Sequence, residues 1–488
     1  MAYQVPQHIA PQKVFLVNFT ELEGRLDPAF YNPQYYKFIN SKTVNWVRLN
    51  AVIENIKHPP EYKRDFVDEG YQLIRSQNVR PTGIDLSENP VYLAKDVVLS
   101  TSAIYPHIND ILIVRSGVNA GDVAVVEDEF KNVTIGADTL LLNVNQEILP
   151  KFVQVYFFTE IGRSLLNRYI TGATNKHLNS YSLKHVYFPK IEISTQERCI
   201  TIIESALLQK SNKLEQAKRL LNSINKSFLS ELGIILQQKS IQSLQDRIFT
   251  LNYSEISGGR FDPKLYSSSI AQLKQSLFMS PYDKQPLKDF IISSCSGEWG
   301  KDELEEVDEN KFSKCLVIRA TEFDNTFNLQ LDNSRVKYRW IENSKLSKMN
   351  IQANDLLIEK SGGSEDQPVG RVSILTDNIL KDNTIAYSNF IHKITVEGIN
   401  PMYLYFYLKT MHNIKITDSM QSQTNGIRNL IMQEYLNQTI VVPPLQKQQE
   451  IVDHITATRK QAKALQEEGK EIIEQAKKEV ERMIIGDQ

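Results

Sequence analysis

Residues 109–117 read Asn-Asp-Ile-Leu-Ile-Val-Arg-Ser-Gly, and residues 354–362 read Asn-Asp-Leu-Leu-Ile-Glu-Lys-Ser-Gly. Further matches lie on both sides of these stretches, in the same order. Gly-Arg-x-Asp-Pro occurs at 24–28 and 259–263, Leu-Ile-Arg at 73–75 is matched by Val-Ile-Arg at 317–319, and Thr-Asn occurs at 174–175 and 424–425. Such ordered self-similarity indicates a tandem duplication of one structural unit.

Each copy shows the same internal plan. It opens with the Gly-Arg-x-Asp-Pro turn, and short β-type runs separated by Gly, Asn and Asp follow. An aromatic-rich helical segment comes next, at 152–158 and 403–408, and a long helical pattern closes the copy. The predicted fold class is therefore α+β, a tandem duplication of two β-rich domains, each followed by a long helix.

Apolar residues recur at alternating steps of four and three in both closing segments. This heptad spacing is typical of a helix that pairs lengthwise with another long helix. Lys210 is the one polar exception in the first segment, and Gly469 is the weak point of the second. We expect the two helices to pair with each other as a coiled coil. The predicted seam residues are Ile203, Leu207, Leu214, Leu221, Ile224, Phe228, Ile451, Ile455, Ala462, Leu465, Ile472 and Met483.

The repeat also predicts domain boundaries. We expect the first β-rich domain at 1–193, its helix at 194–236, a polar connector at 237–250, the second β-rich domain at 251–444 and its helix at 445–488. A chain of 488 residues exceeds what one hydrophobic core usually fills, which agrees with this division.

Composition excludes several classes of protein. Apolar residues at 41% and charged residues at 23% are typical of a folded water-soluble protein. The sequence has no apolar stretch of the roughly 20 residues that span a bilayer, no secretion signal and only three cysteines, so we expect a cytoplasmic location and no membrane. The formal net charge of −2 argues against wrapping of nucleic acid by the whole surface and leaves room for a local basic face.

Catalytic signals are weak. Asn32-Pro33-Gln34-Tyr35 resembles a methyltransferase loop, but it lacks the preceding strand and the glycine-rich turn. Asp355 with Glu359-Lys360 suggests a nuclease cluster, but the first copy lacks the second carboxylate, so we interpret the match as coincidence. The sequence has neither a nucleotide P-loop nor histidines and cysteines at metal-ligand spacing. We therefore expect no catalytic residues, no metal and no cofactor on this chain.

The repeated polar elements suit DNA. At the end of an expected strand, each copy places a cation, a hydroxyl and a glycine, which can bind a phosphate or the edge of a base. Polar, basic loops follow at equivalent places, and asparagine can bind adenine through two hydrogen bonds. β-Turns and surface loops without function are the alternative reading. The DNA-binding candidates are Arg75, Arg115, Ser116, Gly117, Thr174, Asn175, Lys176, Arg319, Lys360, Ser361, Gly362, Thr424, Asn425 and Arg428.

These features together resemble the specificity subunit of type I restriction–modification enzymes. The points of similarity are the Gly-Arg-x-Asp-Pro opening, the Asn-Asp-Ile-Leu-Ile run ending in Arg or Lys, Ser and Gly, and Pro443-Pro444-Leu445-Gln446 before the second long helix. The first copy departs from the last point, since it reads Pro-Lys-Ile-Glu-Ile-Ser-Thr-Gln at 189–196. The resemblance covers essentially the whole chain.

The resemblance implies two target-recognition domains, related by pseudo-twofold symmetry, with the helices antiparallel between them. Each domain is then expected to read one half of a split, asymmetric site in double-stranded DNA. Catalysis is implied to reside in partners: two adenine-methyltransferase subunits, which use S-adenosylmethionine and dock on the helices, and restriction or translocase subunits, which use ATP and Mg.

Two other functions stay open at this point. The chain could instead be the target-reading subunit of a two-subunit type II enzyme that cuts on both sides of its site. It could also be a protein scaffold that binds no DNA, with the coiled coil serving oligomerisation. DNA binding in the presence of a methyltransferase partner would separate the scaffold from the two DNA readers.

Overall fold

The computed structural model describes residues 14–22, 26, 28–35, 39, 44–172, 174–236, 248, 250, 252–253, 268–302, 308–323, 328–331, 335–364, 367–424 and 427–486. They form two compact units. Unit 1 holds the described residues up to 216 and from 464 onward, and unit 2 holds those from 217 to 463. Most of the Gly-Arg-x-Asp-Pro openings and of the expected connector lies outside the described residues.

The units do not follow the predicted domain boundaries. The closing helices, α5 (Ile193–Glu231) and α12 (Leu445–Ile485), are each divided between the two units. α5 ends at Glu231 rather than at the expected residue 236, because Leu232 and Gly233 form a turn in which Gly233 has a φ of +65°. A compact unit thus combines one β-rich domain with helix segments from both repeats.

The central sheet of unit 1 has the strand order β2-β11-β8-β9 and is antiparallel throughout. β8 (Ile111–Val114), the strand in the repeated stretch, is buried along its whole length. Ile111 and Ile113 pack into a core that includes residues of α5 and α12, whereas Leu112 and Val114 pack against a second sheet. The run is apolar on both faces because both faces of the strand are covered. The other strands are β2 (Ile53–Lys57), β9 (Val123–Val125) and β11 (Thr139–Val144).

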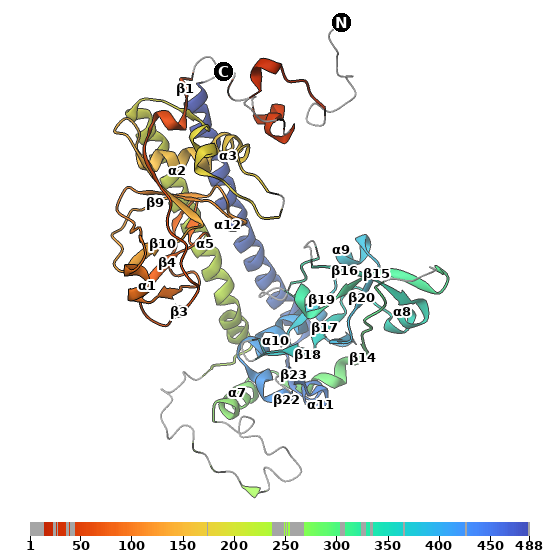
Figure 1. Ribbon diagram of the computed structural model, residues 1–488. Coiled ribbons are helices and arrows are strands. Elements are labelled where there is room, and N and C mark those ends of the chain that lie inside the picture. Colours follow the sequence, from red (N-terminus) through yellow and green to blue (C-terminus); the bar gives the residue numbers. More distant parts are fainter. Residues whose placement is uncertain are drawn as a thin grey trace. The chain divides into compact units, whose positions relative to one another are not determined.

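The second sheet of unit 1 has the order β10-β4-β7-β3, and its β4–β10 pair is parallel. Its strands are β3 (Phe66–Val67), β4 (Tyr71–Ile74), β7 (Tyr92–Leu93) and β10 (Val133–Ile135). The hairpin β5–β6 (Val79–Arg80, Gly83–Ile84) and the short pair β1–β12 (Trp46–Arg48, Tyr187–Pro189) complete the strands. The helices before α5 are α1 (Lys95–Leu99), α2 (Pro150–Phe158), α3 (Glu160–Asn167) and α4 (Ser180–Lys184) (Figure 1).

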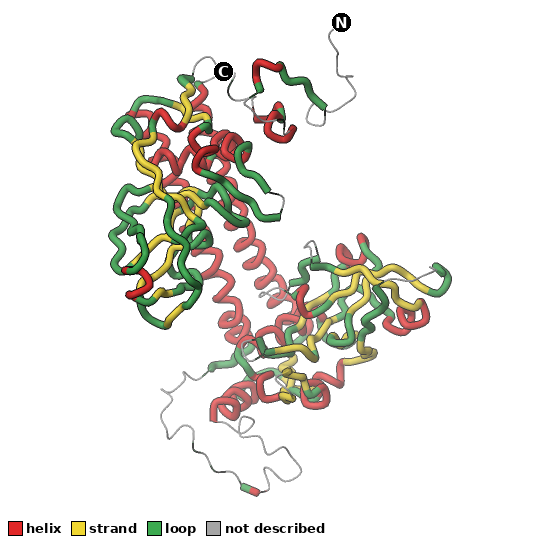
Figure 2. The backbone as a smooth tube through the Cα atoms, viewed as in Figure 1, coloured by secondary structure: helices red, strands yellow, loops and turns green. Residues whose placement is uncertain are grey.

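Unit 2 repeats this topology. Its central sheet β14-β21-β17-β19 corresponds to β2-β11-β8-β9, its parallel pair β15–β20 to β4–β10, and its pair β13–β24 to β1–β12. Figure 2 shows helices, strands and loops in both units. Leu356 and Ile358 of β17 face the helical core and Leu357 faces the second sheet, as in β8. The equal strand order agrees with the duplication predicted from the sequence.

The strands of unit 2 are β13 (Asp283–Pro286), β14 (Ile291–Ser296), β15 (Phe312–Ile318), β16 (Lys337–Glu342), β17 (Leu356–Glu359), β18 (Ser361–Gly363), β19 (Val372–Ile374), β20 (Ile385–Tyr387), β21 (Ile391–Val396), β22 (Gln421–Thr424), β23 (Ile427–Leu430) and β24 (Thr439–Val442). The helices are α7 (Ser268–Phe278), α8 (Asn343–Met349), α9 (Asp377–Asp382), α10 (Pro401–Asn413) and α11 (Met432–Leu436). The sheet β18-β23-β22 has no strand counterpart among the described residues of unit 1.

Segments of α5 and α12 run antiparallel within each unit. In unit 1 the beginning of α5 shares a core with the end of α12, where Ile203 and Ala206 join Ile473 and Val480, and Lys213 pairs with Glu468 at 2.6 Å. In unit 2 the end of α5 shares a core with the beginning of α12 through Phe228, Leu229, Ile451 and Ile455. Both sets of contacts have the direction that the resemblance implied.

The predicted seam needs one correction. Leu214 is 41% exposed, and the preceding Lys213 turns toward α12 instead. Ile203, Phe228, Ile451, Ile455 and Ala462 are buried, and Leu207, Leu221, Ile224, Leu465, Ile472 and Met483 are half-buried. Four further residues of the two helices are buried although the heptad pattern did not predict them: Ala206, Ile473, Val480 and Ile484. The cause is that a helix of 3.6 residues per turn drifts against a strict heptad, so the buried stripe moves to neighbouring positions.

Candidate nucleic-acid interface

In unit 1, Arg115, Ser116 and Gly117 follow β8 directly and are half-buried at the end of the central sheet. The Arg115 N–H donates to the Asp138 carbonyl at 2.7 Å, which ties the turn to the residue before β11. Gly117 has a φ of +96°, a left-handed conformation that glycine adopts without strain. The chain can therefore turn out of the sheet directly after the cation and the hydroxyl.

The structure brings this turn together with the predicted loop 174–177. The Gly117 N–H donates to the Lys176 carbonyl at 3.0 Å, and the Ser116 hydroxyl lies 3.1 Å from His177 Nδ1. Arg115 Nε donates to His177 Nε2 at 3.4 Å. Thr174, Asn175 and Lys176 are exposed. We call Arg115–Gly117 with residues 174–177 the first strand-end site.

The second strand-end site, Lys360–Gly362 with residues 428 and 429, has the same construction in unit 2. The Lys360 N–H donates to the Phe390 carbonyl at 2.9 Å, and Gly362 has a φ of +98°. β18 pairs with β23, with Ser361 opposite Asn429 and Gly363 opposite Arg428. The Ser361 hydroxyl donates to Asn429 Oδ1. Thr424 ends β22, but its side chain and all of Asn425 lie outside the described residues.

The two sites differ in how they hold the cation. Lys360 Nζ donates to the Ser296 hydroxyl at 2.9 Å, and that hydroxyl lies 3.4 Å from His392 Nδ1. Burial lowers the pKa of His392 to about 4, and the Lys360 charge adds to this effect, so His392 is neutral at pH 7. His177 belongs to the predicted polar loop, whereas Ser296, His392 and Asn429 were not predicted from the sequence. Asn429 lies one residue after the candidate Arg428, so chain position was the only signal for it.

Arg75 and Arg319 have different surroundings from the strand-end cations. Arg75 Nη2 donates to the Asn89 carbonyl at 2.6 Å. Arg319 forms an ion pair with Glu322 at 2.7 Å, and the Glu322 side chain is fully buried. A guanidinium that neutralises a buried carboxylate has a structural role, and this argues against the expected DNA contact of Arg319.

The nuclease-like cluster does not exist as a site. Asp355 forms an ion pair with Lys393 at 3.1 Å, and Glu359 forms one with Arg371 at 2.8 Å. Both pairs are buried, and burial raises the pKa of Glu359 although Arg371 opposes the shift. Each carboxylate is neutralised inside the protein and is not available to a metal ion, which agrees with the interpretation of the sequence match as coincidence.

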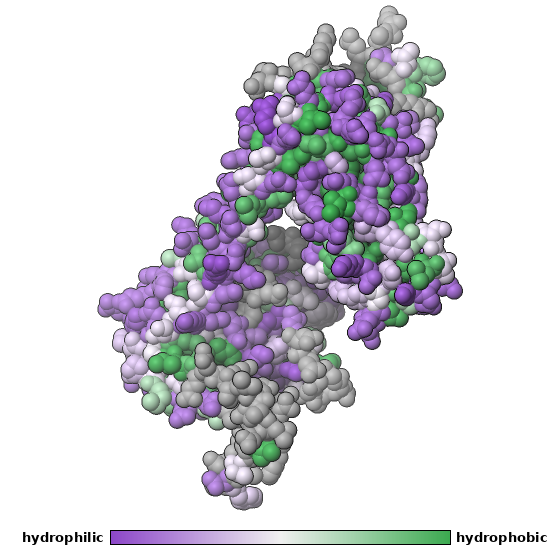
Figure 3. Space-filling model, turned by 90° about the vertical axis from the view of Figure 1, so that its left-hand side faces the viewer, coloured by the Kyte–Doolittle hydropathy of each residue, from purple (hydrophilic) through white to green (hydrophobic). Residues whose placement is uncertain are grey.

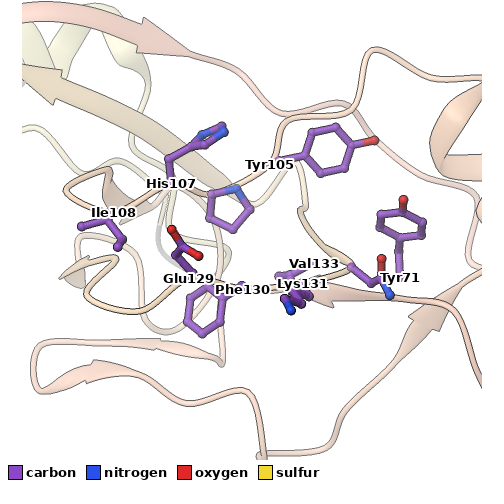
Figure 4. A pocket seen from close by; sticks show the side chains of 10 residues that line it. Tyr71, Tyr105, His107, Ile108, Glu129, Phe130, Lys131 and Val133 are labelled. Atoms are coloured by element: carbon purple, nitrogen blue, oxygen red, sulfur yellow. The ribbon is translucent and has the colours of Figure 1, made fainter.

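A hollow of about 540 Å³ opens beside β4 and β10 in unit 1 (Figure 4). Its aromatic wall includes Tyr71 and Tyr105, whose ring centroids lie 6.1 Å apart. His107, Glu129 and Lys131 add groups of both charges. None of the predicted DNA-binding residues lines the hollow, so it is separate from the first strand-end site.

The described part of the chain offers little other chemistry. These residues contain no cluster of His, Cys, Asp and Glu that could hold a metal ion. Burial raises the pKa of the Cys199 and Cys315 thiols to about 11, so neither is a thiolate at pH 7. No described helix is apolar enough over a sufficient length to cross a membrane. On the face shown in Figure 3, hydrophilic residues predominate and apolar residues form small groups.

Similarity to solved structures extends over most of the chain. The HsdS subunit from Thermoanaerobacter tengcongensis shares 12% identity over 91% of this chain and 97% of its own, with a TM-score of 0.40. A structure titled as the basis of complex assembly and conformational transition of the type I R-M system shares 13% identity over 91% and 98%, with a TM-score of 0.49. The type I restriction–modification S subunit from M. genitalium shares 14% identity over 92% and 98%, with a TM-score of 0.39.

Comparison with models of protein families finds a match in the second repeat. No curated protein sequence matches the chain. A family model described as the type I restriction modification DNA specificity domain matches residues 287–475, from the segment before β14 into α12. The matched family is one of recognition domains, which agrees with the expectation of a non-catalytic specificity subunit. Residues 287–475 of this chain are therefore similar to the DNA specificity domain of type I restriction–modification systems.

Proposed function

We propose that the chain is the DNA-recognition subunit of a type I restriction–modification complex, in which the two repeats read the two halves of a split, asymmetric site. The observation that carries the proposal is the pair of strand-end sites. Arg115-Ser116-Gly117 and Lys360-Ser361-Gly362 occupy equivalent places in two units whose central sheets have equal strand order. A polar loop lies against the first and the polar strand β23 against the second.

The side chains at the two strand-end sites support the proposal that the two repeats bind different half-sites. Both offer a cation, a hydroxyl and a close backbone approach, the groups that bind phosphates and base edges. The remaining groups differ, since His177 accompanies Arg115 whereas Asn429 accompanies Ser361. A duplicated protein with two similar faces can bind two half-sites at a fixed spacing. Different side chains on the two faces then select different bases.

The proposal includes the partners that the resemblance implied. Two adenine-methyltransferase subunits, carrying S-adenosylmethionine, would dock on α5 and α12, and restriction or translocase subunits would supply ATP- and Mg-dependent cleavage. Both long helices carry exposed charged residues outside their shared cores, among them Glu215, Lys218, Lys470 and Glu471, which a partner can bind. Adenine methylation requires the base to leave the duplex, so the methyltransferase would do the chemistry while this chain holds the register.

The test selects bound duplexes from a degenerate pool, using the full chain co-purified with an adenine methyltransferase. We expect the parent to select a split site. If Arg115 and Lys360 bind phosphate, Arg115→Ala and Lys360→Ala should each weaken binding to every duplex and lower the salt slope by about one. If they read guanine, each variant should lose roughly 1–3 kcal/mol at one position, in opposite halves of the site.

Lys95→Ala and Lys288→Ala serve as matched controls, because both residues are exposed cations outside the strand-end sites. They should leave the selected sequence and the salt slope unchanged. Absence of duplex binding by the parent complex would overturn the proposed function. Binding by both strand-end variants that equals the parent's would show that these sites do not face the DNA.

A further inference from the structure

A further pair of equivalent residues lies beside the two strand-end sites. Asp138 directly precedes β11 in unit 1, and Phe390 directly precedes β21 in unit 2. The Asp138 carbonyl accepts the Arg115 N–H, and the Phe390 carbonyl accepts the Lys360 N–H, at 2.7 and 2.9 Å. The backbone therefore places one side chain next to each cation, by the same hydrogen bond in both repeats.

The two side chains have opposite chemistry. Asp138 is exposed, and its carboxylate has no hydrogen bond or ion pair with any residue that the structure describes. Phe390 is 45% exposed, and its ring lies along the backbone of Gly362, where an added Cβ would be 3.6 Å from Phe390 Cδ2. The unit 2 site thus presents an aromatic ring beside Lys360, and the unit 1 site presents a carboxylate beside Arg115.

Neither side chain has an evident role in the fold. A single exposed apolar residue is ordinary on a protein surface, so the exposure of Phe390 alone carries nothing. Its position is informative, because the Phe390 carbonyl binds the Lys360 N–H and the Phe390 ring lies beside Gly362. Near a polyanion, a carboxylate such as Asp138 is repelled unless a base offers it a donor, which makes it a selective group.

We infer that Asp138 and Phe390 are specificity-determining residues at the equivalent position of the two strand-end sites. Asp138 accepts a hydrogen bond from the amino group of a cytosine in one half-site, and Phe390 contacts the methyl group of a thymine in the other. The inference rests on the proposed function and extends it, because it names a base class for each half of the site.

The experiment uses the full chain with its methyltransferase partner and the duplex selected by the parent. Thymines in the half-site read by unit 2 are replaced one at a time by uracil, which removes only the methyl group. We expect one replacement to weaken parent binding by about fourfold, the effect of one buried methyl group. The same replacement should have no effect on Phe390→Ala. Ile292→Ala, which removes another exposed apolar side chain of unit 2, should respond to uracil as the parent does.

The unit 1 arm compares Asp138→Ala with the parent on the degenerate pool. We expect the preference for cytosine at one position to fall by roughly fivefold or more. Binding to non-cognate duplexes should become tighter, because a repelled charge is gone. Asp128→Asn, at another exposed carboxylate of unit 1, is the control.

The possible outcomes separate the two proposals. A parent complex that selects no sequence overturns the proposed function and, with it, this inference. A parent that selects a split site, together with a Phe390→Ala variant that keeps the uracil effect and an Asp138→Ala variant that keeps its base preference, overturns the inference alone. Lower stability of Phe390→Ala without any change in base preference would also overturn the role of Phe390.

Discussion

Lys210 of α5 and Gly469 of α12 contact each other across the antiparallel helix segments of unit 1. A Cβ added to Gly469 would lie 3.4 Å from Lys210 Cγ and 3.7 Å from the Lys210 carbonyl oxygen. These two residues are the irregular positions of the predicted seam, a cation in one helix and a glycine in the other. They coincide because the absent side chain of Gly469 leaves room for the aliphatic stem of Lys210.

Gly469→Ala should stabilise unit 1 by about 0.5–1 kcal/mol. Glycine inside a helix costs about that much relative to alanine, and the distances to Lys210 permit an ordinary van der Waals contact. Gly469→Leu should instead destabilise it by about 1–3 kcal/mol through overpacking. Urea unfolding of the three proteins checks both signs. A destabilising alanine would mean that the helices approach more closely at this point than the structure shows.

Gln196 and Gln448 are equivalent glutamines of the two repeats, and we expect both to stabilise the fold. Gln196 Oε1 accepts the Leu149 N–H and its Nε2 donates to the Ile191 carbonyl, whereas Gln448 uses the same atoms for the Asn400 N–H and the Pro443 carbonyl. Both side chains are buried. Replacing either by leucine should cost about 1–3 kcal/mol, because buried backbone groups lose their partners. Gln461→Leu, at an exposed position of α12, should change the unfolding midpoint little, and equal effects at all three positions would contradict the assignment.

Asp355 forms a buried ion pair with Lys393 in unit 2, whereas the equivalent Asp110 of unit 1 has no lysine beside it in the described part of the chain. The strand register places Leu141 where unit 2 has Lys393, and Asn143 where it has Thr395. Asn143 Nδ2 donates to Asp110 at 2.6 Å, as the Thr395 hydroxyl does to Asp355 at 2.6 Å. Lys393→Leu should destabilise unit 2 by about 3–5 kcal/mol, since a buried carboxylate loses its counter-ion.

The double variant Lys393→Leu with Thr395→Asn should recover part of this loss, because an Asn amide offers two N–H donors where the Thr395 hydroxyl offers one, and Asn143 is the donor to Asp110 in the first repeat. Lys314→Leu, at an exposed position of β15, controls for the change of residue type. Chemical unfolding followed by circular dichroism measures all four proteins. A Lys393→Leu variant as stable as the parent would show that the ion pair contributes no net stability.

His392 predicts a dependence of stability on pH. Burial first and the Lys360 charge second lower its pKa to about 4 in the folded protein, and its Nε2 has no hydrogen-bond partner among the described residues. The unfolded chain, with a histidine pKa of about 6.5, binds more protons between these values. The stabilising contribution is therefore complete above about pH 6.5 and is lost as the pH falls to 4.

Unfolding free energies of the parent and of His392→Asn at pH 7, 5.5 and 4.5 check this prediction. The parent should lose more stability than the variant over this range. His58→Asn, at an exposed histidine, should follow the parent. Parallel pH curves for the parent and His392→Asn would refute the assignment.

The sequence by itself determined the duplication, the α+β class and the place of the strand-end sites. These follow from local order. A strand such as β8, apolar on both faces, must lie between two layers, and a repeated stretch must fold alike twice. The long helices were predicted for the same reason, because a heptad pattern is visible in consecutive residues.

The tertiary structure decided which residues meet. Arg319 was a DNA-binding candidate from its motif alone, and only the fold shows that Glu322 is buried beside it. Ser116 meets His177 across a separation of 61 residues, and Lys210 meets Gly469 from the other repeat's helix. Strand register, turn conformation and the drift of a helix against the heptad fix such pairs, and each depends on parts of the chain that no local pattern relates.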